Sequence, residues 1–192
     1  MNRASVLFVI LATMVFLVGC TEQGTMTGTS FIGGTTGLET SFLQGSPPDK
    51  TTDGGSSGFS IVIRADNIGE SDVAPEDGYV QIWGLDAGTY GASQYTDFKQ
   101  QFQEPIRGAQ KSFDGSIING GTSTIEFGDL SYLPTIQGDL PQTIYANICY
   151  KYSTKVAAQI CVKNNAEQAL NSKQVCEVEG EKYPQNSGAP IS

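Results

Sequence analysis

The chain has 192 residues, of which 39% are hydrophobic, and this is enough for one folded domain with a core. Charged residues make up only 16% and glycine occurs 23 times, a composition that favours β structure with many turns. The formal net charge of -9 repels a phosphate backbone, and the lack of histidine removes Ser-His-Asp and Cys-His catalysis together with the commonest ligand of catalytic zinc. We therefore expect neither nucleic-acid binding nor enzymatic activity, and no cofactor.

The first 20 residues have the layout of an export signal, because Arg3 precedes an apolar run over residues 6–18. As a helix this run would extend roughly 20 Å, short of the ~30 Å hydrocarbon core of a bilayer. It ends in Leu17-Val18-Gly19-Cys20, which resembles the lipobox of prokaryotic lipoproteins. The resemblance implies that residues 1–19 are removed and that Cys20 is lipidated, which would hold the protein at the outer face of the membrane. An ordinary secretory signal or an uncleaved anchor would also place the remainder outside.

Residues 20–57 are rich in glycine, threonine, serine and proline, and we predict that they form a flexible stalk. Apolar residues at Phe31, Leu38 and Phe42 leave open a second interpretation, in which part of this segment docks on the domain as an edge strand. The domain itself is predicted over residues 58–179.

Three segments alternate apolar and polar residues with the period of two that is typical of strands, at residues 59–64, 79–83 and 122–127. In the second of them, Val80 and Ile82 would share the face toward the core.

Residues 93–102 predict a short helix, because Tyr95, Phe98 and Phe102 would lie on one helical face. A second short helix is predicted at residues 164–172.

Residues 143–152 and 156–163 predict a β-hairpin with a turn around residues 153–155. A last strand is expected at residues 174–178. Residues 180–192 are expected to be a disordered tail or a junction to a further domain. The side chains expected to point inward from the hairpin are Ile148, Tyr150, Ala158, Ile160 and Val162.

Besides Cys20 the chain has Cys149, Cys161 and Cys176, and an oxidising compartment favours a disulfide among these three. The hairpin prediction slightly favours Cys149 with Cys161, and the alternative joins Cys161 to Cys176. Three cysteines without histidine are too few for a structural zinc site.

Two groups of side chains are weak candidates for a binding site. Ca²⁺ takes about six to eight oxygen ligands, but the four acidic residues after the first strand lack the spacing of a calcium loop, so a solvated turn is the simpler interpretation. Aromatic residues around the second strand could form a platform for a glycan or peptide. The acidic group comprises Glu70, Asp72, Glu76 and Asp77, and the aromatic group comprises Tyr79, Trp83 and Tyr90.

The segment from Phe59 to Trp83 contains Asp-Asn-Ile-Gly-Glu between two alternating strands, ending in Tyr-Val-Gln-Ile-Trp. It resembles the N-x-G-E strand-turn-strand of immunoglobulin-like adhesion modules of the CARDB type and of domains in archaeal surface-layer-related proteins. That resemblance implies that Asn67 and Gly69 make a tight turn in an all-β, immunoglobulin-like β-sandwich. We expect a lipoprotein at the cell surface that acts as a structural or adhesive module for other surface proteins. The alternative is an extracytoplasmic lipoprotein that binds a cation, a glycan or a transported solute.

Overall fold

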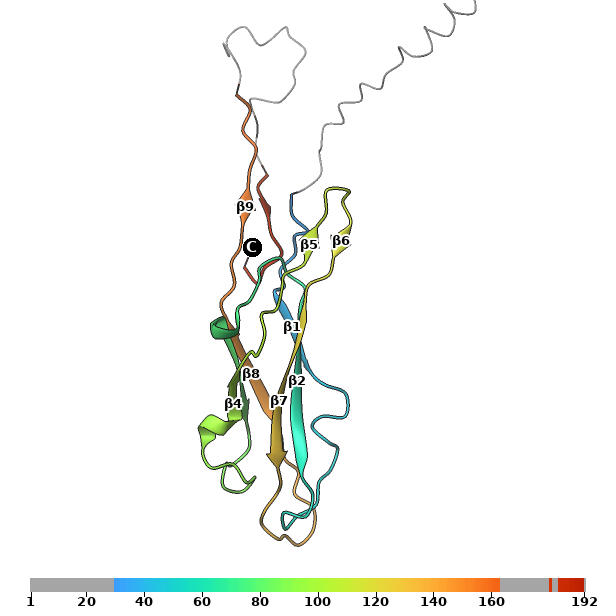
Figure 1. The fold of residues 1–192 in the computed structure, drawn as a ribbon, viewed down its shortest axis with the longest axis vertical. Helices are drawn as coiled ribbons and strands as arrows, with labels where there is room; N and C mark the ends of the chain where they lie inside the picture. The colour runs from blue at the N-terminus through green and yellow to red at the C-terminus, as the bar shows by residue number, and fades with distance from the viewer. Residues whose placement is uncertain (1–29, 163–179, 181–182, 192) are drawn as a thin grey trace, which may run out of the picture.

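The computed structural model describes residues 30–162, 180 and 183–191 (Figure 1). These residues form strands joined by turns and loops, with two short 3₁₀ segments, η1 (Pro75–Asp77) and η2 (Tyr95–Phe98). In the described part of the chain, no helix has the length and apolar character needed to span a bilayer. The prediction of an all-β fold is confirmed. The strands are β1 (Leu38–Phe42), β2 (Phe59–Asn67), β3 (Gly78–Trp83), β4 (Lys99–Gln101), β5 (Gln110–Lys111), β6 (Ile117–Ile118), β7 (Thr122–Leu130), β8 (Tyr145–Tyr150), β9 (Val156–Ala157) and β10 (Gln185–Asn186).

Two antiparallel three-stranded sheets, β1-β2-β7 and β4-β3-β8, make up the body of the elongated molecule (Figure 1). Alternation along each strand sends its apolar side chains to one face, and both sheets contribute to a single hydrophobic cluster. The three strands predicted at residues 59–64, 79–83 and 122–127 lie within β2, β3 and β7 and are confirmed. The fully or almost fully buried strand residues of this core are Ile61, Ile63, Ala65, Val80, Ile82, Ile125 and Phe127.

Side chains join the edges of the two sheets on both sides of the core. On one side, the Gln100 amide of β4 donates a hydrogen bond of 2.9 Å to the Glu126 carbonyl of β7. On the other side, the Leu38 amide of β1 donates to the Tyr150 hydroxyl of β8 at 3.2 Å. These bonds satisfy backbone groups that an edge strand would otherwise leave unpaired.

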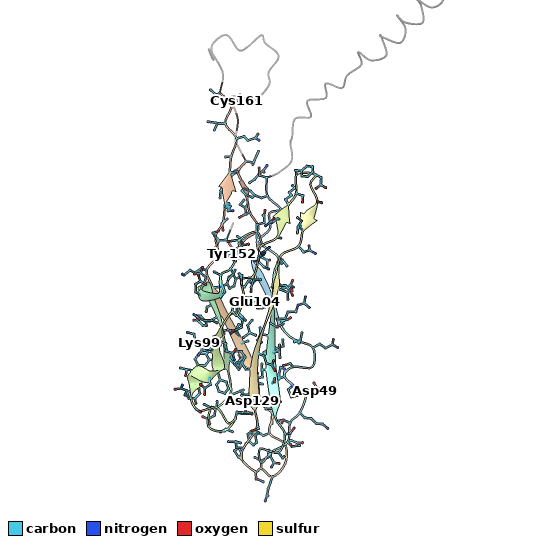
Figure 2. All side chains as sticks on the ribbon, viewed as in Figure 1. Asp49, Lys99, Glu104, Asp129, Tyr152 and Cys161 are labelled. Carbon is cyan, nitrogen blue, oxygen red and sulfur yellow. The ribbon has the colours of Figure 1, made fainter. Side chains whose placement is uncertain are left out.

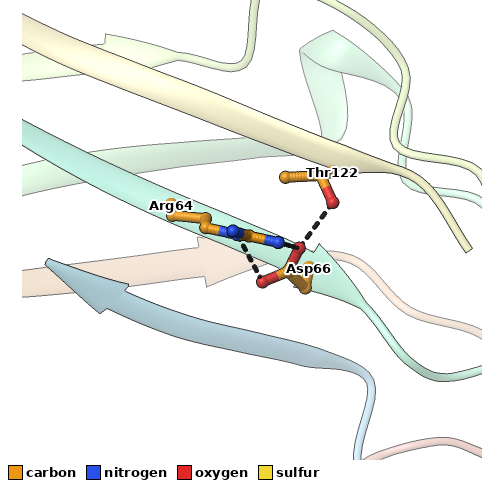
Figure 3. A network of polar contacts seen from close by, with 3 residues as sticks. All are labelled: Arg64, Asp66 and Thr122. Atoms are coloured by element: carbon orange, nitrogen blue, oxygen red, sulfur yellow. Dashed lines mark hydrogen bonds and ion pairs between the residues drawn. The ribbon is translucent and has the colours of Figure 1, made fainter. Parts of the chain in front are cut away.

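A small polar network covers the outer face of β2 (Figure 3). The Arg64 guanidinium donates to both oxygens of Asp66, at 2.8 and 2.9 Å, and the Thr122 hydroxyl of β7 donates to the same carboxylate. Residues i and i+2 of a strand share a face, which is why Arg64 and Asp66 meet. The hydrogen bonds from Arg64 and Thr122 lower the pKa of Asp66.

The predicted helix at residues 93–102 is wrong. Only Tyr95–Phe98 (η2) makes a 3₁₀ turn, and Lys99–Gln101 forms β4 beside β3. Phe98 and Phe102 are buried as predicted, whereas the Tyr95 side chain is exposed. A spacing of four places two residues on the same face of a strand as well as of a helix, so the aromatic pattern could not separate the two.

The predicted hairpin between residues 143–152 and 156–163 is also wrong. Strand β8 pairs with β3 across six register pairs, and β9 pairs with β10. Ile148 and Tyr150 do pack against the core, but Ile160 and Val162 are more than 80% exposed. Alternation fixes which face a strand buries but not which strand it pairs with.

Both predicted limits of the folded domain need correction. Leu38–Phe42, placed in the flexible stalk, forms β1 and pairs with β2 in five register positions, so the edge-strand interpretation is correct there. Near the other terminus, Gln185–Asn186 forms β10, and Ser187 and Ala189 are buried. Because these last residues lie in the fold, residues 185–190 are not a disordered tail. The helix predicted at 164–172 and the strand predicted at 174–178 lie outside the described residues.

Candidate functional site

The Asn-x-Gly-Glu segment after β2 forms the centre of a polar network, which we call the Asn67 hub (Asn67, Gly69, Glu70, Ser71 and Tyr152). The buried Asn67 amide donates to the carbonyl oxygens of Ser71 at 2.8 Å and Ile106 at 3.1 Å. The Tyr152 hydroxyl donates to Asn67 Oδ1 at 2.9 Å and accepts from the Ser71 amide at 3.1 Å. The polar side-chain atoms of Asn67 and the Tyr152 hydroxyl therefore all have partners, as buried polar groups require.

The hub also ties both ends of the described chain to the body. Glu70 Oε2 accepts hydrogen bonds from the amides of Gly33 at 3.1 Å and Gly188 at 2.6 Å. A Cβ atom on Gly69 would lie 2.2 Å from the Tyr152 hydroxyl and 2.6 Å from the Gly188 carbonyl, so only glycine fits. Burial raises the pKa of Tyr152. The segment that resembles an adhesion-module turn thus has a structural role here, in which it joins distant segments.

The other predicted acidic candidates are separated by their individual partners. Asp72 accepts from the Gly108 amide at 2.7 Å, and Asp77 forms an ion pair with Lys151 at 2.7 Å. Glu76 lies in η1 and is exposed. Across the described residues, no three acidic or cysteine side chains are grouped so that they could hold a metal ion.

The cysteines do not pair in the way that the predicted hairpin favoured. Cys149 is a free, exposed thiol on β8, opposite Tyr79 of β3 in the register. The predicted disulfide between Cys149 and Cys161 is therefore wrong. It depended on the predicted hairpin, and β8 instead pairs with β3. Cys161 is not free, and its pairing with Cys176 stays a prediction because Cys176 lies outside the described residues. Cys20, the predicted lipidation site, also lies outside them.

The predicted aromatic platform does not form. Tyr79 and Trp83 are on the outer face of β3, where the Lys99 ammonium lies 3.7 Å from the centre of the Tyr79 ring. Tyr90, in contrast, is only 6% exposed and belongs to the core. Its ring packs edge-on against Phe59 and Tyr132, with centroid distances of 6.2 and 5.4 Å.

That aromatic cluster is the floor of a pocket, which we call the distal cleft, of about 1030 Å³. The cleft is lined by Phe42, Phe59, Tyr90 and residues of two loops, 47–53 and 132–144. The loops join β1 to β2 and β7 to β8, and they lie at the end of the molecule opposite the Asn67 hub (Figure 1). This is the candidate functional site of the described chain.

Backbone hydrogen bonds hold the two loops of the distal cleft together. The amides of Gly54 and Gly55 donate to the carbonyls of Pro134 and Tyr132, at 3.0 and 2.8 Å. Asp53 Oδ2 accepts from the Ile136 amide at 2.9 Å. Because these bonds cross between the loops, they fix the positions of the two loops relative to each other.

The cleft combines an apolar floor with a charged, solvent-facing rim. Burial, and to a lesser extent Tyr132, raises the pKa of Tyr90, so its buried phenol stays protonated at neutral pH. Leu140 is 54% exposed at the wall of the cleft. Aromatic rings packed edge to face beside exposed apolar and carboxylate groups suit a partner with both apolar surface and hydrogen-bond donors. The charged lining residues are Asp49, Lys50, Asp53 and Asp139.

Sequence reasoning named Phe42, Phe59 and Tyr90 among the residues of the distal cleft, but it did not bring them together in one site. The available signal was two proline-bearing segments: residues 47–48, which were placed in the predicted stalk, and residues 133–141, for which no element was predicted. No family model, no curated protein and no solved structure matches this chain.

Proposed function

We propose that the protein is a non-enzymatic cell-surface lipoprotein, anchored through Cys20, that acts as an interaction module and binds its partner in the distal cleft. The observation that carries this proposal is the position of the cleft. Ser30, the first described residue, hydrogen-bonds to Gln185 of β10 at 3.1 Å, at the end of the molecule away from the cleft (Figure 1). A lipid on Cys20 would therefore orient the cleft toward the surroundings of the cell.

The sequence pattern supports the anchor, and the two facing sheets support an immunoglobulin-like sandwich as the finer description of the fold. In such modules binding residues are commonly carried by loops at one end of a rigid β scaffold. A disulfide between Cys161 and Cys176 would close the segment beyond β9, on the side of the hub (Figure 2 places Cys161 at this end).

Membrane fractionation of cells that express the full chain tests the anchor. We expect the unmodified protein in the membrane fraction and Cys20→Ser in the soluble extracellular or periplasmic fraction. Mass spectrometry of the purified protein should show an amino-terminal cysteine carrying acyl chains. An unprocessed amino terminus, or membrane retention of Cys20→Ser, would contradict lipid anchoring.

Site-specific photo-cross-linking on intact cells tests the cleft. The exposed Lys50 on the cleft rim is replaced by a photoreactive amino acid, and Thr124 on the outer face of β7 is replaced in the matched control. We expect one defined adduct with a surface macromolecule from position 50 and none from position 124. No adduct at position 50, or equal yields at both positions, would count against the cleft as the binding site.

A second candidate function, the binding of a soluble ligand, is favoured by the size of the cleft. Its volume of about 1030 Å³ is near the upper limit of pockets for small molecules, which hold roughly 300–1,000 Å³. A thermal-shift screen with soluble oligosaccharides and short peptides separates the two functions. A shift that is lost in Leu140→Ser, without any cross-linked macromolecule, would favour the ligand-binding lipoprotein.

A further inference from the structure

The end of the molecule that carries Ser30 also carries an exposed apolar hairpin. Strands β5 and β6 pair through Gln110↔Ile118 and Lys111↔Ile117, and the turn between them projects beyond the body (Figure 1). Phe113 in this turn is 96% exposed, and Ile117 and Ile118 are 57% and 55% exposed. Phe113 lies in the turn, and the consecutive residues Ile117 and Ile118 point to opposite faces of β6, so apolar side chains surround this projecting hairpin. Apolar surface concentrated on one projection marks a contact surface rather than scattered surface residues.

The conformation of the hairpin is fixed by its own hydrogen bonds. The Ser112 amide donates to the Ser116 carbonyl at 2.8 Å, and the Gly115 amide donates to the Ser112 carbonyl at 3.0 Å. Asp114 Oδ1 accepts from both the amide and the hydroxyl of Ser116, at 3.0 and 2.7 Å. The turn therefore presents the Phe113 ring to the surroundings.

The position of the hairpin relative to Ser30 indicates what covers it. Along the long axis of the molecule, the hairpin tip and the start of the described chain lie at the same end (Figure 1). From Cys20 to Ser30 the chain can span at most about 35 Å, at 3.3–3.6 Å per residue. If Cys20 is lipidated, this end of the molecule is held next to the bilayer.

The charge of the hairpin agrees with a lipid surface. Residues 110–119 contain one cation, Lys111, and one anion, Asp114, so their formal charge is zero although that of the whole chain is -9. A neutral tip avoids the repulsion from anionic lipids that the rest of the protein would experience. The charged Asp114 beside Phe113 limits insertion to the interfacial region and opposes entry into the hydrocarbon core.

We infer that the β5–β6 hairpin inserts Phe113, Ile117 and Ile118 into the interface of the bilayer to which the protein is anchored. This contact rests on the lipid anchor proposed above. It adds a second attachment point, so that the hairpin and the lipid together fix the orientation in which the distal cleft faces away from the membrane. One lipid anchor alone would leave the domain free to rotate about the segment that follows Cys20.

Depth-dependent fluorescence quenching in the intact lipidated protein tests this contact. Trp83, the sole tryptophan, is changed to phenylalanine, and a single tryptophan is introduced as Phe113→Trp, or as Leu140→Trp in the distal cleft for the matched control. Ile117→Trp serves as a second reporter on the hairpin. Each protein is reconstituted in phosphatidylcholine vesicles with and without bromine on the acyl chains, and flotation establishes how much protein is bound.

We expect brominated chains to reduce the emission of Phe113→Trp and Ile117→Trp about twofold, because interfacial side chains reach roughly 5–10 Å into the headgroup and acyl boundary. Leu140→Trp should be unchanged. Floating protein with no quenching on the hairpin, or with equal quenching at position 140, would overturn the hairpin contact and leave the anchor intact. A blue-shifted but unquenched indole at position 113 would show that a second copy of the chain covers the hairpin, which also overturns it. Protein that does not float would overturn the anchor and the hairpin contact together.

Discussion

The Asn67 hub and the distal cleft lie at opposite ends of one core. The hub consists of closely packed polar groups, whereas the cleft is an open space with an apolar lining. In the hub, each buried polar atom has a partner, and Gly69 leaves no room for even one additional carbon atom. In the cleft, aromatic and aliphatic side chains surround an open volume of about 1030 Å³. The comparison teaches that the most distinctive sequence motif marks the structural end of the molecule, whereas the candidate binding end is encoded by loops without a motif.

The largest expected effect comes from filling the space at the hub. Gly69→Ala should lower the free energy of unfolding by about 3 kcal/mol, at the upper end of the cost of overpacking, because the added carbon collides with oxygens of Tyr152 and Gly188. Urea unfolding followed by circular dichroism measures the loss. Gly58→Ala is the control, since its Cβ would be 3.8 Å from the nearest atom, and it should change stability by less than about 0.5 kcal/mol. Equal losses in both variants would show that the hub has no special packing.

A smaller effect is expected when one hydroxyl is removed from the hub. Tyr152→Phe leaves Asn67 Oδ1 and the Ser71 amide without their partner, which should cost about 2 kcal/mol. The same measurement applied to Tyr145→Phe, whose side chain is 60% exposed, should show almost no change. If both tyrosine variants were as stable as the parent, water would be replacing the hydroxyl and the hub would be less tightly closed than its geometry indicates.

The cleft should respond in the opposite way, with loss of binding and little loss of stability. Leu140→Ser removes an exposed apolar group, so the free energy of unfolding should change by less than about 0.5 kcal/mol. The yield of the adduct from a photoreactive residue at position 50 should fall about tenfold, equivalent to about 1.4 kcal/mol of binding. Undiminished cross-linking in a folded Leu140→Ser protein would separate the cleft from the interaction.

The smallest effect concerns the outer face of β2, which belongs to neither end. Hydrogen bonds from Arg64 and Thr122 lower the pKa of Asp66, so its contribution to stability is present above the pKa of an unfolded aspartate, about 3.9, and is lost as the pH falls through the folded value. Asp66→Asn should therefore reduce the melting temperature slightly at pH 7. The difference from the parent should shrink toward pH 3, and a difference that grows on acidification would contradict this assignment.

The predictable part of the fold consists of the strands whose side chains alternate between core and solvent. Ile61 and Ile63 in β2 and Val80 and Ile82 in β3 are buried as their period of two indicated. Partner choice was not predictable, because β8 has the same alternation whether it pairs with β3 or with β9. The edge strand β1 was left as one of two interpretations, since its short apolar pattern is flanked by glycine and proline.

The candidate site was harder to predict than the core. Tyr90 was singled out as an aromatic residue, but its partners Phe59 and Tyr132 come from positions 31 and 42 residues away and meet it only through tertiary packing. The hydrogen bonds that join the two loops of the cleft use main-chain groups, apart from the Asp53 carboxylate, so side-chain composition hardly indicates them. Glu70 and Asp72 were misleading for a related reason, because their partners are backbone amides of remote segments.

The hydrogen bonds that Glu70 accepts from Gly33 and Gly188 determine how late in folding the native structure is completed. The carboxylate connects segments separated by about the whole length of the domain, and contacts this distant in sequence form late and slowly. Translation delivers residue 188 long after residue 33, so the contact between Glu70 and Gly188 cannot form early in synthesis. If the chain is exported as proposed above, this delay would keep it incompletely folded while it crosses the membrane.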